Sequence, residues 1–577
     1  MTGRRGGAVL AVTLGIVLSA CSGVPTKSTP QIIGPVRGGT TAVAPTVAPA
    51  AGADPRSIVK GFLSASASSD QHHSAARSFL TADARNRWSD TTVTIVDSEL
   101  IGNFDSVEST VTMSGRQMGT INAAGVYTPV LKGSGAGGDA VPFSFGLRRI
   151  GGEWRINSLK NGIVIGYDEF QRLYEQRPLY FLNLTDDRLV PDPRFTPLVD
   201  PSDLATWLVG QLAAGPRPEL QEAVNTSLPA QIDPRSVTVT IGAVSAVEVP
   251  GASQLDASTR NQLAAQLALT LQPVMGQAPL SITDGGKTVR IPAFGSTQFT
   301  ASQFSALVAP PTLAPALYYL RGGGVADASG RALPGAIGSG GYNLTSVAVS
   351  AGGAADVPIA ATNGPSSDSR LVIGTQRTGL RTTTVHGVLS RPAWVPFLDE
   401  VWVGDGAMIY RTTIGGRSSV VQLSASVGTI AGRVEALRLS PEGSRVAMVL
   451  AARDGTAQLW LGAVVRNAGQ VRVDSLEPIS PLGVVVTDVA WNDQLKLFLI
   501  GRSPATGESS IYEVQVDGSL WTPRSIANLP PGPDSITVAE NAPAWVSAGG
   551  TVWTQRGGSW ASPGSDTTFG TAPVYAD

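Results

Sequence analysis

The sequence predicts a multidomain protein in which two N-terminal α+β domains are followed by an all-β propeller of about six blades. Three observations predict this class. The first two regions each contain segments of helical hydrophobic periodicity and segments with strand-like patterns, and in the first region the helices precede the strands. From Leu317 onward, short strand patterns recur at spacings of about 40 to 45 residues, which is typical of propeller blades. The 66 glycines and 40 prolines among 577 residues favour turns and short strands over long helices.

The first 20 residues have the pattern of a lipoprotein signal peptide. Basic Arg4-Arg5 precedes an apolar stretch over 8–18 that is too short to span a bilayer. Leu18, Ser19 and Ala20 then form a lipobox directly before Cys21, the only cysteine in the chain. We expect cleavage after Ala20 and an N-palmitoyl, S-diacylglycerol cysteine at position 21, which anchors the chain by two or three acyl chains. The alternatives are an ordinary signal peptide with an incidental Cys21, or an uncleaved anchor helix.

Residues 21–53 are expected to form a tether, because prolines recur there among Thr, Ala, Gly and Val. At about 3.1 Å per residue, such a tether can hold the first domain up to roughly 100 Å from the membrane. No later stretch offers about eighteen uninterrupted apolar residues, so no second membrane span is predicted. The 42 basic and 44 acidic side chains leave no electrostatic footprint for nucleic acid. We therefore expect a lipid-anchored protein on the extracytoplasmic face of the cell membrane.

Residues 54–177 are predicted to form the first α+β domain. Asp54-Pro55 resembles a helix cap followed by a first-turn proline, and the apolar residues over 58–63 fall on one helical face. A second short helix is expected over 75–80. Beyond Trp88 the period of two predicts antiparallel strands. This succession is similar to the small cone-like folds related to nuclear transport factor 2.

Residues 178–310 are predicted to form the second α+β domain. An apolar strand over 179–182 and an edge strand over 189–191 precede a helix that Asp203 opens and Gly215-Pro216 stops. A second helix is expected over 258–271, and a strand and turn over 282–287 close the domain. These motifs, in this order, resemble the GerMN module, an α+β domain first noticed in spore-germination proteins. That resemblance implies an interaction module without established catalytic residues.

Residues 311–577 are predicted to form the propeller. The clearest unit, residues 434–449, is two strands joined by the tight turn Ser440-Pro441-Glu442-Gly443. Trp394, Trp491 and Trp545 occupy matching places in their units. We expect these tryptophans to fill the cores between blades, and carbohydrate stacking is the alternative role.

No strong catalytic signature is present, since the chain lacks HExxH, Gly-x-Ser-x-Gly, P-loop and CxxC motifs. His386 lies in a strand-like run and is expected to be a partly buried structural residue. The adjacent His72 and His73 are not expected to bind a metal ion. We therefore expect no enzyme activity, no cofactor and no metal site.

The order of lipobox, tether, α+β domain, GerMN-like module and propeller resembles the LpqB family of actinobacterial lipoproteins. The start of the mature chain, Cys21-Ser22-Gly23-Val24-Pro25 followed by Gln31-Ile32-Ile33-Gly34, is similar to that of the family. The resemblance implies binding to the extracellular domain of the sensor histidine kinase MtrB, which links the state of the envelope to wall metabolism and division. Two other classes remain open: a glycan- or lipid-binding scaffold that contacts cell-wall components without a signalling role, and a degenerate hydrolase that uses His386 or paired carboxylates.

Overall fold

The structure is a computed structural model that describes residues 48–68, 73–97, 100–130, 140–185, 187–230, 232–308, 315–351, 356–467, 469–480, 483–563 and 569–576. The expected signal peptide 1–20, Cys21, most of the tether 21–53, and His72 lie outside these residues. Within the described part of the chain, no helix is long and apolar enough to cross a membrane. Residues Val47–Asp577 belong to one structural unit.

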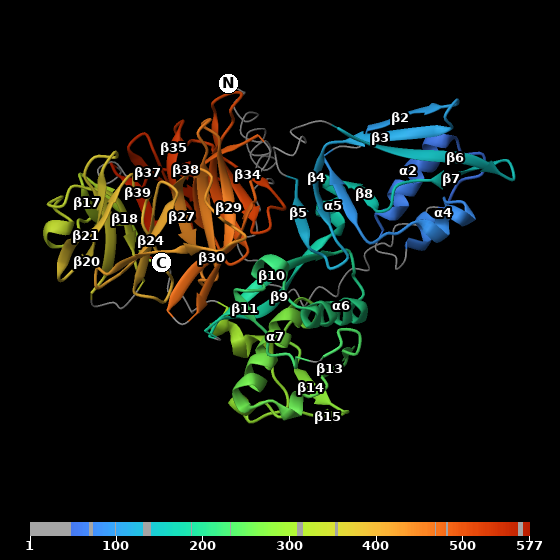
Figure 1. Cartoon of the computed structure of the whole chain (residues 1–577), viewed down its shortest axis with the longest axis horizontal. Helices are drawn as coiled ribbons and strands as arrows, with labels where there is room; N and C mark the ends of the chain where they lie inside the picture. Colours follow the sequence, from blue (N-terminus) through green and yellow to red (C-terminus); the bar gives the residue numbers. More distant parts are fainter. Residues whose placement is uncertain are drawn as a thin grey trace, which may run out of the picture. The chain divides into compact units, whose positions relative to one another are not determined.

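The first region combines short helices with two four-stranded sheets (Figure 1). Its helices are α2 (Pro55–Ser66), α3 (Ser74–Arg77), α4 (Ala82–Arg87) and α5 (Tyr167–Leu173). One sheet has the order β5-β4-β1-β8 (Tyr127–Pro129, Gln117–Ile121, Val93–Val96, Ile163–Gly166). The other has the order β2-β3-β6-β7 (Leu100–Asp105, Thr110–Gly115, Val141–Ile150, Glu153–Ser158). Helix α2 contacts strands of both sheets, so it closes the core of this region.

The predicted start of the first helix is confirmed. The Asp54 side chain accepts hydrogen bonds from the backbone N–H groups of Arg56 and Ser57, at 3.0 and 3.2 Å. The expectation of antiparallel strands is wrong for one pair, because β1 runs parallel to β8. A period of two indicates which side chains share a face of the sheet, but it does not indicate the direction of the neighbouring strand.

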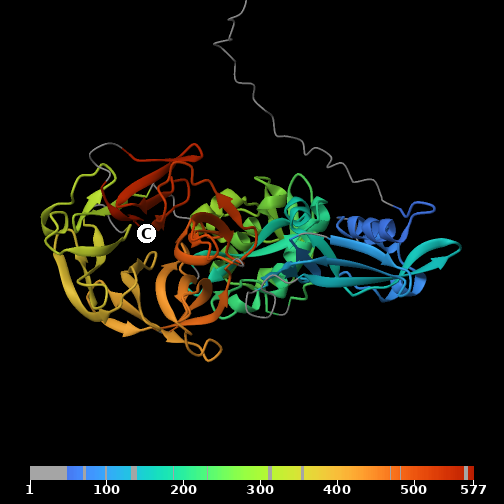
Figure 2. The ribbon, with the colours of Figure 1, turned by 90° about the horizontal axis from the view of Figure 1, so that it is seen from above.

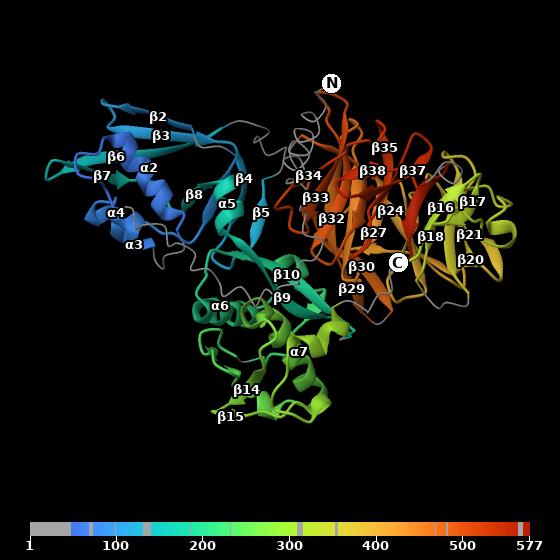
Figure 3. The same ribbon diagram turned by 180° about the vertical axis from the view of Figure 1, so that it is seen from behind.

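The second region has two helices beside a small sheet, and a further sheet at its far end (Figure 3). The first sheet has the order β10-β9-β11 (Leu189–Thr196, Glu175–Asn183, Val224–Asn225). The second has the order β12-β13-β14-β15 (Thr238–Thr240, Ser245–Glu248, Leu280–Asp284, Lys287–Thr288). The helices are α6 (Pro201–Ala214) and α7 (Ala257–Met275), with short 3-10 turns η2 (Pro218–Leu220), η3 (Ala252–Gln254), η4 (Pro292–Phe294) and η5 (Ala301–Leu307). Both helices contact β9, which places the core between them and the first sheet.

Helix α6 begins earlier than predicted. Asp200, not Asp203, is the cap, and its Oδ1 accepts hydrogen bonds from the N–H groups of Ser202 and Asp203 at 2.9 and 3.1 Å. Pro201 then occupies the first turn, where a missing N–H has no cost because that group has no intrahelical partner. The helix ends before Gly215, as predicted.

The third region is all-β and its described residues form six sheets, which confirms the propeller class. The sheets are β17-β16-β39 (Gly324–Asp327, Leu317–Arg321, Thr571–Tyr575); β18-β19-β20-β21 (Leu344–Val349, Pro358–Asn363, Ser369–Thr375, Gly379–Gly387); β22-β23-β24-β25 (Ala393–Trp394, Glu400–Asp405, Met408–Thr413, Ser418–Val420); β26-β30-β29-β28-β27 (Gln422–Leu423, Gln470–Pro478, Ala457–Asn467, Arg445–Ala451, Arg433–Leu439); β31-β32-β33-β34 (Val485–Trp491, Lys496–Arg502, Ser509–Gln515, Thr522–Arg524); and β35-β36-β37-β38 (Pro533–Thr537, Trp545–Ala548, Thr551–Arg556, Ser559–Ala561). A 3-10 turn, η6 (Gly335–Ile337), lies between β17 and β18.

The six sheets close into a ring (Figure 2), the arrangement in which the blades of a propeller surround a central channel. The innermost strand of each sheet, which we call its channel strand, contacts the channel strand of the next sheet. In order around the ring, the channel strands are β18, β22, β27, β31, β35 and β39, and β39 contacts β18. The last strand of the chain closes the ring, because β39 pairs antiparallel with β16 at the start of the propeller. This closure leaves only short sheet edges, which neighbouring sheets protect.

The prediction that Trp394, Trp491 and Trp545 occupy matching places in their sheets is correct for the first two. Trp394 and Trp491 lie in the channel strands β22 and β31, whereas Trp545 lies in β36, the second strand of its sheet. The expectation for Trp545 is therefore wrong by one strand. Its sheet starts with β35, a short strand in which proline and polar residues hide the apolar signal on which the matching depended.

Candidate functional site

Strand β10 is the place where the three regions meet. Pro191 and Pro193 have no N–H, and prolines within sheets are confined to edge strands such as β10. All of β10 is nevertheless buried, because both other regions cover its free edge. The Pro191 carbonyl oxygen accepts a hydrogen bond from Arg445 of the propeller, and the Phe195 N–H donates to the Gly125 carbonyl of the first region at 2.7 Å. One strand thus carries hydrogen bonds to both neighbours.

A buried carboxylate, Asp192, organises the side of β10 that faces the first region. Its Oδ2 accepts hydrogen bonds from Arg194 Nη2 at 2.6 Å and from the Arg217 backbone N–H at 2.8 Å. Arg194 Nη1 also donates to the Ala124 carbonyl, and Arg217 Nη2 donates to the Tyr127 carbonyl, both at 3.3 Å. Because buried charges require such pairing, these two arginines join the second region to the first.

The propeller binds the same strand through Arg445 and Gln494. Arg445 Nη1 forms a buried ion pair with Glu442 Oε1 at 2.9 Å, and its Nη2 is the group that donates to β10. Gln494 Nε2 donates to the carbonyls of Leu189 and Val308, at 3.1 and 2.8 Å. Carbonyl groups that are shielded from water need donors, and these two side chains supply them. We call this set of contacts around β10 the β10 junction.

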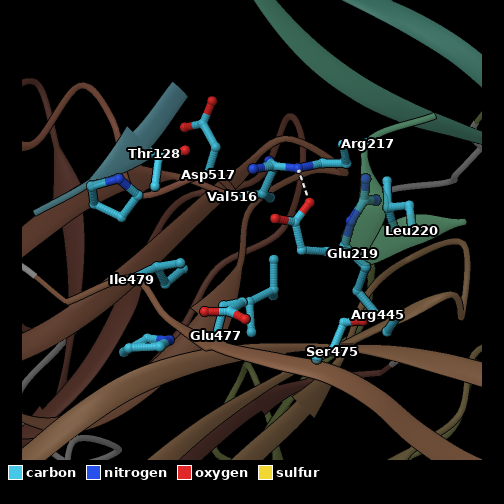
Figure 4. Close-up of a pocket in the computed structure, with 15 residues that line it drawn as sticks. Thr128, Arg217, Glu219, Leu220, Arg445, Ser475, Glu477, Ile479, Val516 and Asp517 are labelled. Carbon is cyan, nitrogen blue, oxygen red and sulfur yellow. Dashed lines mark hydrogen bonds and ion pairs between the residues drawn. The ribbon is translucent and has the colours of Figure 1, made fainter. Parts of the chain in front are cut away.

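A cavity of about 90 Å³ lies at the β10 junction and is lined by all three regions (Figure 4). Thr128 comes from the first region, Arg217 and Glu219 from the second, and Glu477 and Asp517 from the propeller. The Arg217 Nε donates to Glu219 Oε2 at 3.0 Å, which is the dashed contact in Figure 4.

Asp517 is the buried carboxylate of this cavity. Its Oδ1 accepts hydrogen bonds from the Ser519 N–H and hydroxyl, at 3.0 and 2.6 Å. Its Oδ2 has no hydrogen-bond partner among the described residues. Burial raises the pKa of Asp517 above its ordinary range, and this effect outweighs the opposing effects of Ser519 and Arg217. The propeller therefore contributes a buried carboxyl group with a raised pKa to the contact with the other regions.

A second cavity, of about 880 Å³, lies at one mouth of the propeller channel. Every sheet of the propeller contributes a residue that follows its channel strand: Ser350, Phe397, Pro441, Asn492, Glu540 and Ala576. Tyr180 and Pro191 of the second region also line it. A volume of about 300 to 1,000 Å³ is typical of sites that bind small molecules. We call this the mouth cavity.

Charged side chains bridge the channel strands next to the mouth cavity. Asp488 lies 3.7 Å from Arg391 and 3.5 Å from Arg438, and all three side chains are largely buried. Arg391 also donates to the carbonyl oxygens of Ile536 and Pro573, at 3.3 and 3.5 Å. Both arginines line the cavity, and their contacts hold neighbouring sheets together there.

The residues singled out from sequence lie apart from one another. The predicted lipidation site Cys21 and lipobox Leu18, Ser19 and Ala20 are outside the described residues and stay a prediction. The expectation that His386 is partly buried is wrong, since its side chain is 62% exposed, with Nδ1 at 3.1 Å from Asp368 Oδ1. Strand β21 is the edge of its sheet, and alternation along it turns the preceding valine inward and the imidazole outward.

The structure also shows the surroundings of His73, Trp394 and Trp491. The His73 ring lies 6.4 Å from the Trp88 ring, and no group of three or more His, Cys, Asp or Glu that could hold a metal ion is found in the described part of the chain. Trp394 is 1% exposed and packs between two sheets, as expected. Trp491 also packs between sheets, donates its indole N–H to the Arg438 carbonyl at 3.1 Å, and borders the mouth cavity.

Sequence reasoning missed the β10 junction. The apolar pattern predicts an edge strand over 189–191, whereas β10 continues, fully buried, through Asp192-Pro193-Arg194. Two prolines that alternate with charged residues are a signal that could have revealed it, because such a strand needs partners from outside its own sheet.

Comparisons with known proteins agree with this architecture. Residues 48–171 match the model "Lipoprotein LpqB, N-terminal domain", residues 178–290 match "Sporulation and spore germination", and residues 322–576 match "Lipoprotein LpqB beta-propeller domain". The Mycobacterium leprae protein named Lipoprotein LpqB is 30% identical over 93% of this chain and 96% of its own length. Its namesake in Mycolicibacterium smegmatis is 31% identical over 77% of this chain and 78% of its own length, and that of Rhodococcus jostii is 28% identical over 91% and 89%. This chain belongs to the lipoprotein LpqB family.

Proposed function

We propose that this protein is a lipid-anchored, extracytoplasmic accessory protein that binds the external domain of an MtrB-like sensor histidine kinase and modulates its signalling. The observation that carries this proposal is the match to the lipoprotein LpqB family along nearly the whole chain. The protein acts by binding, without catalytic residues or a cofactor, and links the state of the envelope to wall metabolism and division.

The anchor is proposed to be the lipid on Cys21 after cleavage behind Ala20. Each buried CH₂ contributes roughly 0.8 kcal/mol, so two or three acyl chains give stable attachment where one does not. Attachment confines the protein to the surface from which the kinase's external domain also projects, and this raises the effective concentration of each partner for the other. A modest intrinsic affinity is then sufficient for binding.

Different domains are proposed to bind different partners. We propose that the domains 54–177 and 178–310 contact the kinase, while the propeller, 311–577, binds another component of the envelope. The β10 junction supports such coupling, because hydrogen bonds and ion pairs from both neighbours converge on one buried strand. A ligand on one region can then bias the others by its differential affinity for their arrangements.

The proposal is tested by crosslinking in intact membranes, followed by pull-down and mass spectrometry. The native chain is compared with Cys21→Ala, which removes the anchor, and with Thr26→Ala, a control in the tether that leaves the lipobox intact. We expect the native chain and the control to recover the sensor kinase, and Cys21→Ala to recover far less. Equal recovery by all three would reject the role of the anchor, and absence of the kinase from all three would reject the proposed partner.

The second candidate is a surface-tethered scaffold that binds a glycan or lipid and has no signalling role. The mouth cavity favours it, since its volume suits a ligand of that size. The same pull-down separates the two candidates. Recovery of wall polymer or of enzymes of wall synthesis, without a kinase, would favour the scaffold.

A further inference from the structure

Three acidic side chains line the mouth cavity. Asp399, Asp493 and Glu540 all line it, and Asp399 and Glu540 are exposed. The Asp493 carboxylate accepts hydrogen bonds from the Leu495 N–H and from the Asn492 amide, both at 2.8 Å, and these donors carry no charge. Among the described residues, none of these three carboxylates forms an ion pair with a basic side chain.

The basic side chains that line the same cavity are engaged elsewhere. Arg391 and Arg438 both contact Asp488, and both are largely buried between the channel strands. Lys496 Nζ lies 3.8 Å from Glu513 Oε1. The two arginines share the carboxylate of Asp488 and are largely buried, whereas the Lys496 side chain is 41% exposed. Asp399 and Glu540 are the exposed charged residues of the lining.

The walls between these charges are aromatic and apolar. Phe397 is 53% exposed although the Arg188 guanidinium lies 4.3 Å from the centre of its ring, and Leu398 beside it is also exposed. Trp491 and Tyr180 complete the wall from the propeller and from the second region. Aromatic faces attract ammonium and guanidinium groups through the ring quadrupole, and more strongly where water is excluded.

A half-buried phenol group also faces this cavity. Tyr180 lines the cavity, and its hydroxyl makes no hydrogen bond with any described residue. Burial, and then the nearby carboxylates of Asp493 and Glu540, raise the pKa of this phenol to about 12. A neutral hydroxyl close to two carboxylates, without a hydrogen bond of its own, is free to accept one from a bound N–H group.

We propose that the mouth cavity binds an organic cation, namely an ammonium or guanidinium group carried on an apolar or aromatic body. The cation lies against Asp399, Asp493 and Glu540, with the Tyr180 hydroxyl as an acceptor, and the apolar body packs on Phe397 and its neighbours. This site does not depend on binding to a kinase. The cation can belong to a basic side chain of a protein segment or to a small amine, since the recognising chemistry is shared.

The test uses the purified full-length mature chain and isothermal titration calorimetry at low ionic strength. The probes are 4-phenylbutylamine, 4-phenylbutanol and 4-phenylbutyrate, which share one body and differ in charge. We expect the amine to bind at least fivefold more tightly than the alcohol, the carboxylate to bind most weakly, and salt to weaken the amine alone. Equal affinity for the three probes, or a preference for the carboxylate, would overturn the proposal.

Variants assign the binding to this cavity. Asp399→Asn and Glu540→Gln change exposed rim residues, so folding is preserved, and each should weaken the amine at least threefold while leaving the alcohol unchanged. Glu508→Gln, in an exposed turn between β32 and β33, is the matched control and should change nothing. Amine binding that is insensitive to both rim variants would reject the site.

A peptide pair separates the two sources of the cation. Acetyl-Phe-Lys-Phe-amide is compared with the same peptide carrying norleucine in place of lysine. If the lysine peptide binds at least tenfold more tightly than 4-phenylbutylamine, and the norleucine peptide does not, the cation belongs to a protein segment. If the lysine peptide falls short of that tenfold gain, the cation belongs to a small amine.

Discussion

Replacing Arg445 by methionine tests whether the β10 junction stabilises the propeller. Methionine keeps an apolar stem of similar reach but removes the guanidinium group, which pairs with Glu442 and donates to the Pro191 carbonyl. The Glu442 carboxylate would then remain buried without its cation, and its Oε2 already lacks a hydrogen-bond partner among the described residues. The carbonyl of Pro191 on β10 would lose its donor as well.

The expected loss is large. Removing one partner of a buried ion pair costs about 3 to 5 kcal/mol, because the remaining charge is uncompensated. For a domain of roughly 250 residues, each kcal/mol lowers the unfolding midpoint by about 2 °C. We therefore expect the thermal transition of the propeller to fall by about 6 to 10 °C. The exposed pair Arg433–Glu435 contributes at most about 1 kcal/mol, so Arg433→Met is the control and should shift the midpoint by less than about 2 °C.

Differential scanning calorimetry measures this shift, and a double variant tests its cause. In Glu442→Gln/Arg445→Met no charge remains buried, so part of the lost stability should return. The reasoning is refuted if Arg445→Met behaves like the control, or if the double variant unfolds no later than the single one.

Three further predictions concern the same surfaces. Deleting residues 571–577 removes the strand that closes the ring, so the propeller's calorimetric transition should disappear, and its persistence would contradict the closure. The folded chain holds the proton of Asp517 more tightly than the unfolded chain, so the free energy of unfolding should fall as pH rises above about 4, and Asp517→Asn should flatten this decrease in pH-dependent melting curves. Gly518 and Gly455 both have positive φ, but only a Cβ on Gly518 would meet another region, at 3.2 Å from Pro129. Gly518→Ala should therefore lower the melting temperature more than Gly455→Ala. Equal losses would count against this contact.

Local signals in the sequence predicted local structure. Asp54-Pro55 opens α2, and Ser440-Pro441-Glu442-Gly443 forms its turn, with the Gly443 N–H bonded to the Ser440 carbonyl at 2.8 Å and φ at 74°. In both cases residues within a few positions of each other determine the geometry. The recurring strands indicated the propeller for the same reason, because each hairpin is a local unit.

Features that depend on distant partners could not be predicted. The parallel pairing of β1 with β8 and the burial of β10 each need residues from elsewhere in the chain. His386 shows the same limit, since its exposure follows from the place of β21 at the edge of a sheet. The mouth cavity combines turns from all six propeller sheets with Tyr180, and no window of sequence holds these residues together.

The pairing of β39 with β16 sets the order of events when this protein is made. A chain that is synthesised from its N-terminus delivers β16 before β39, which follows about 250 residues later. Until those final residues have emerged, the ring is open and its channel strands lack one neighbour. The mouth cavity, which Val574 and Ala576 help to line, forms only at that moment. An incomplete chain therefore cannot bind anything that depends on the finished ring.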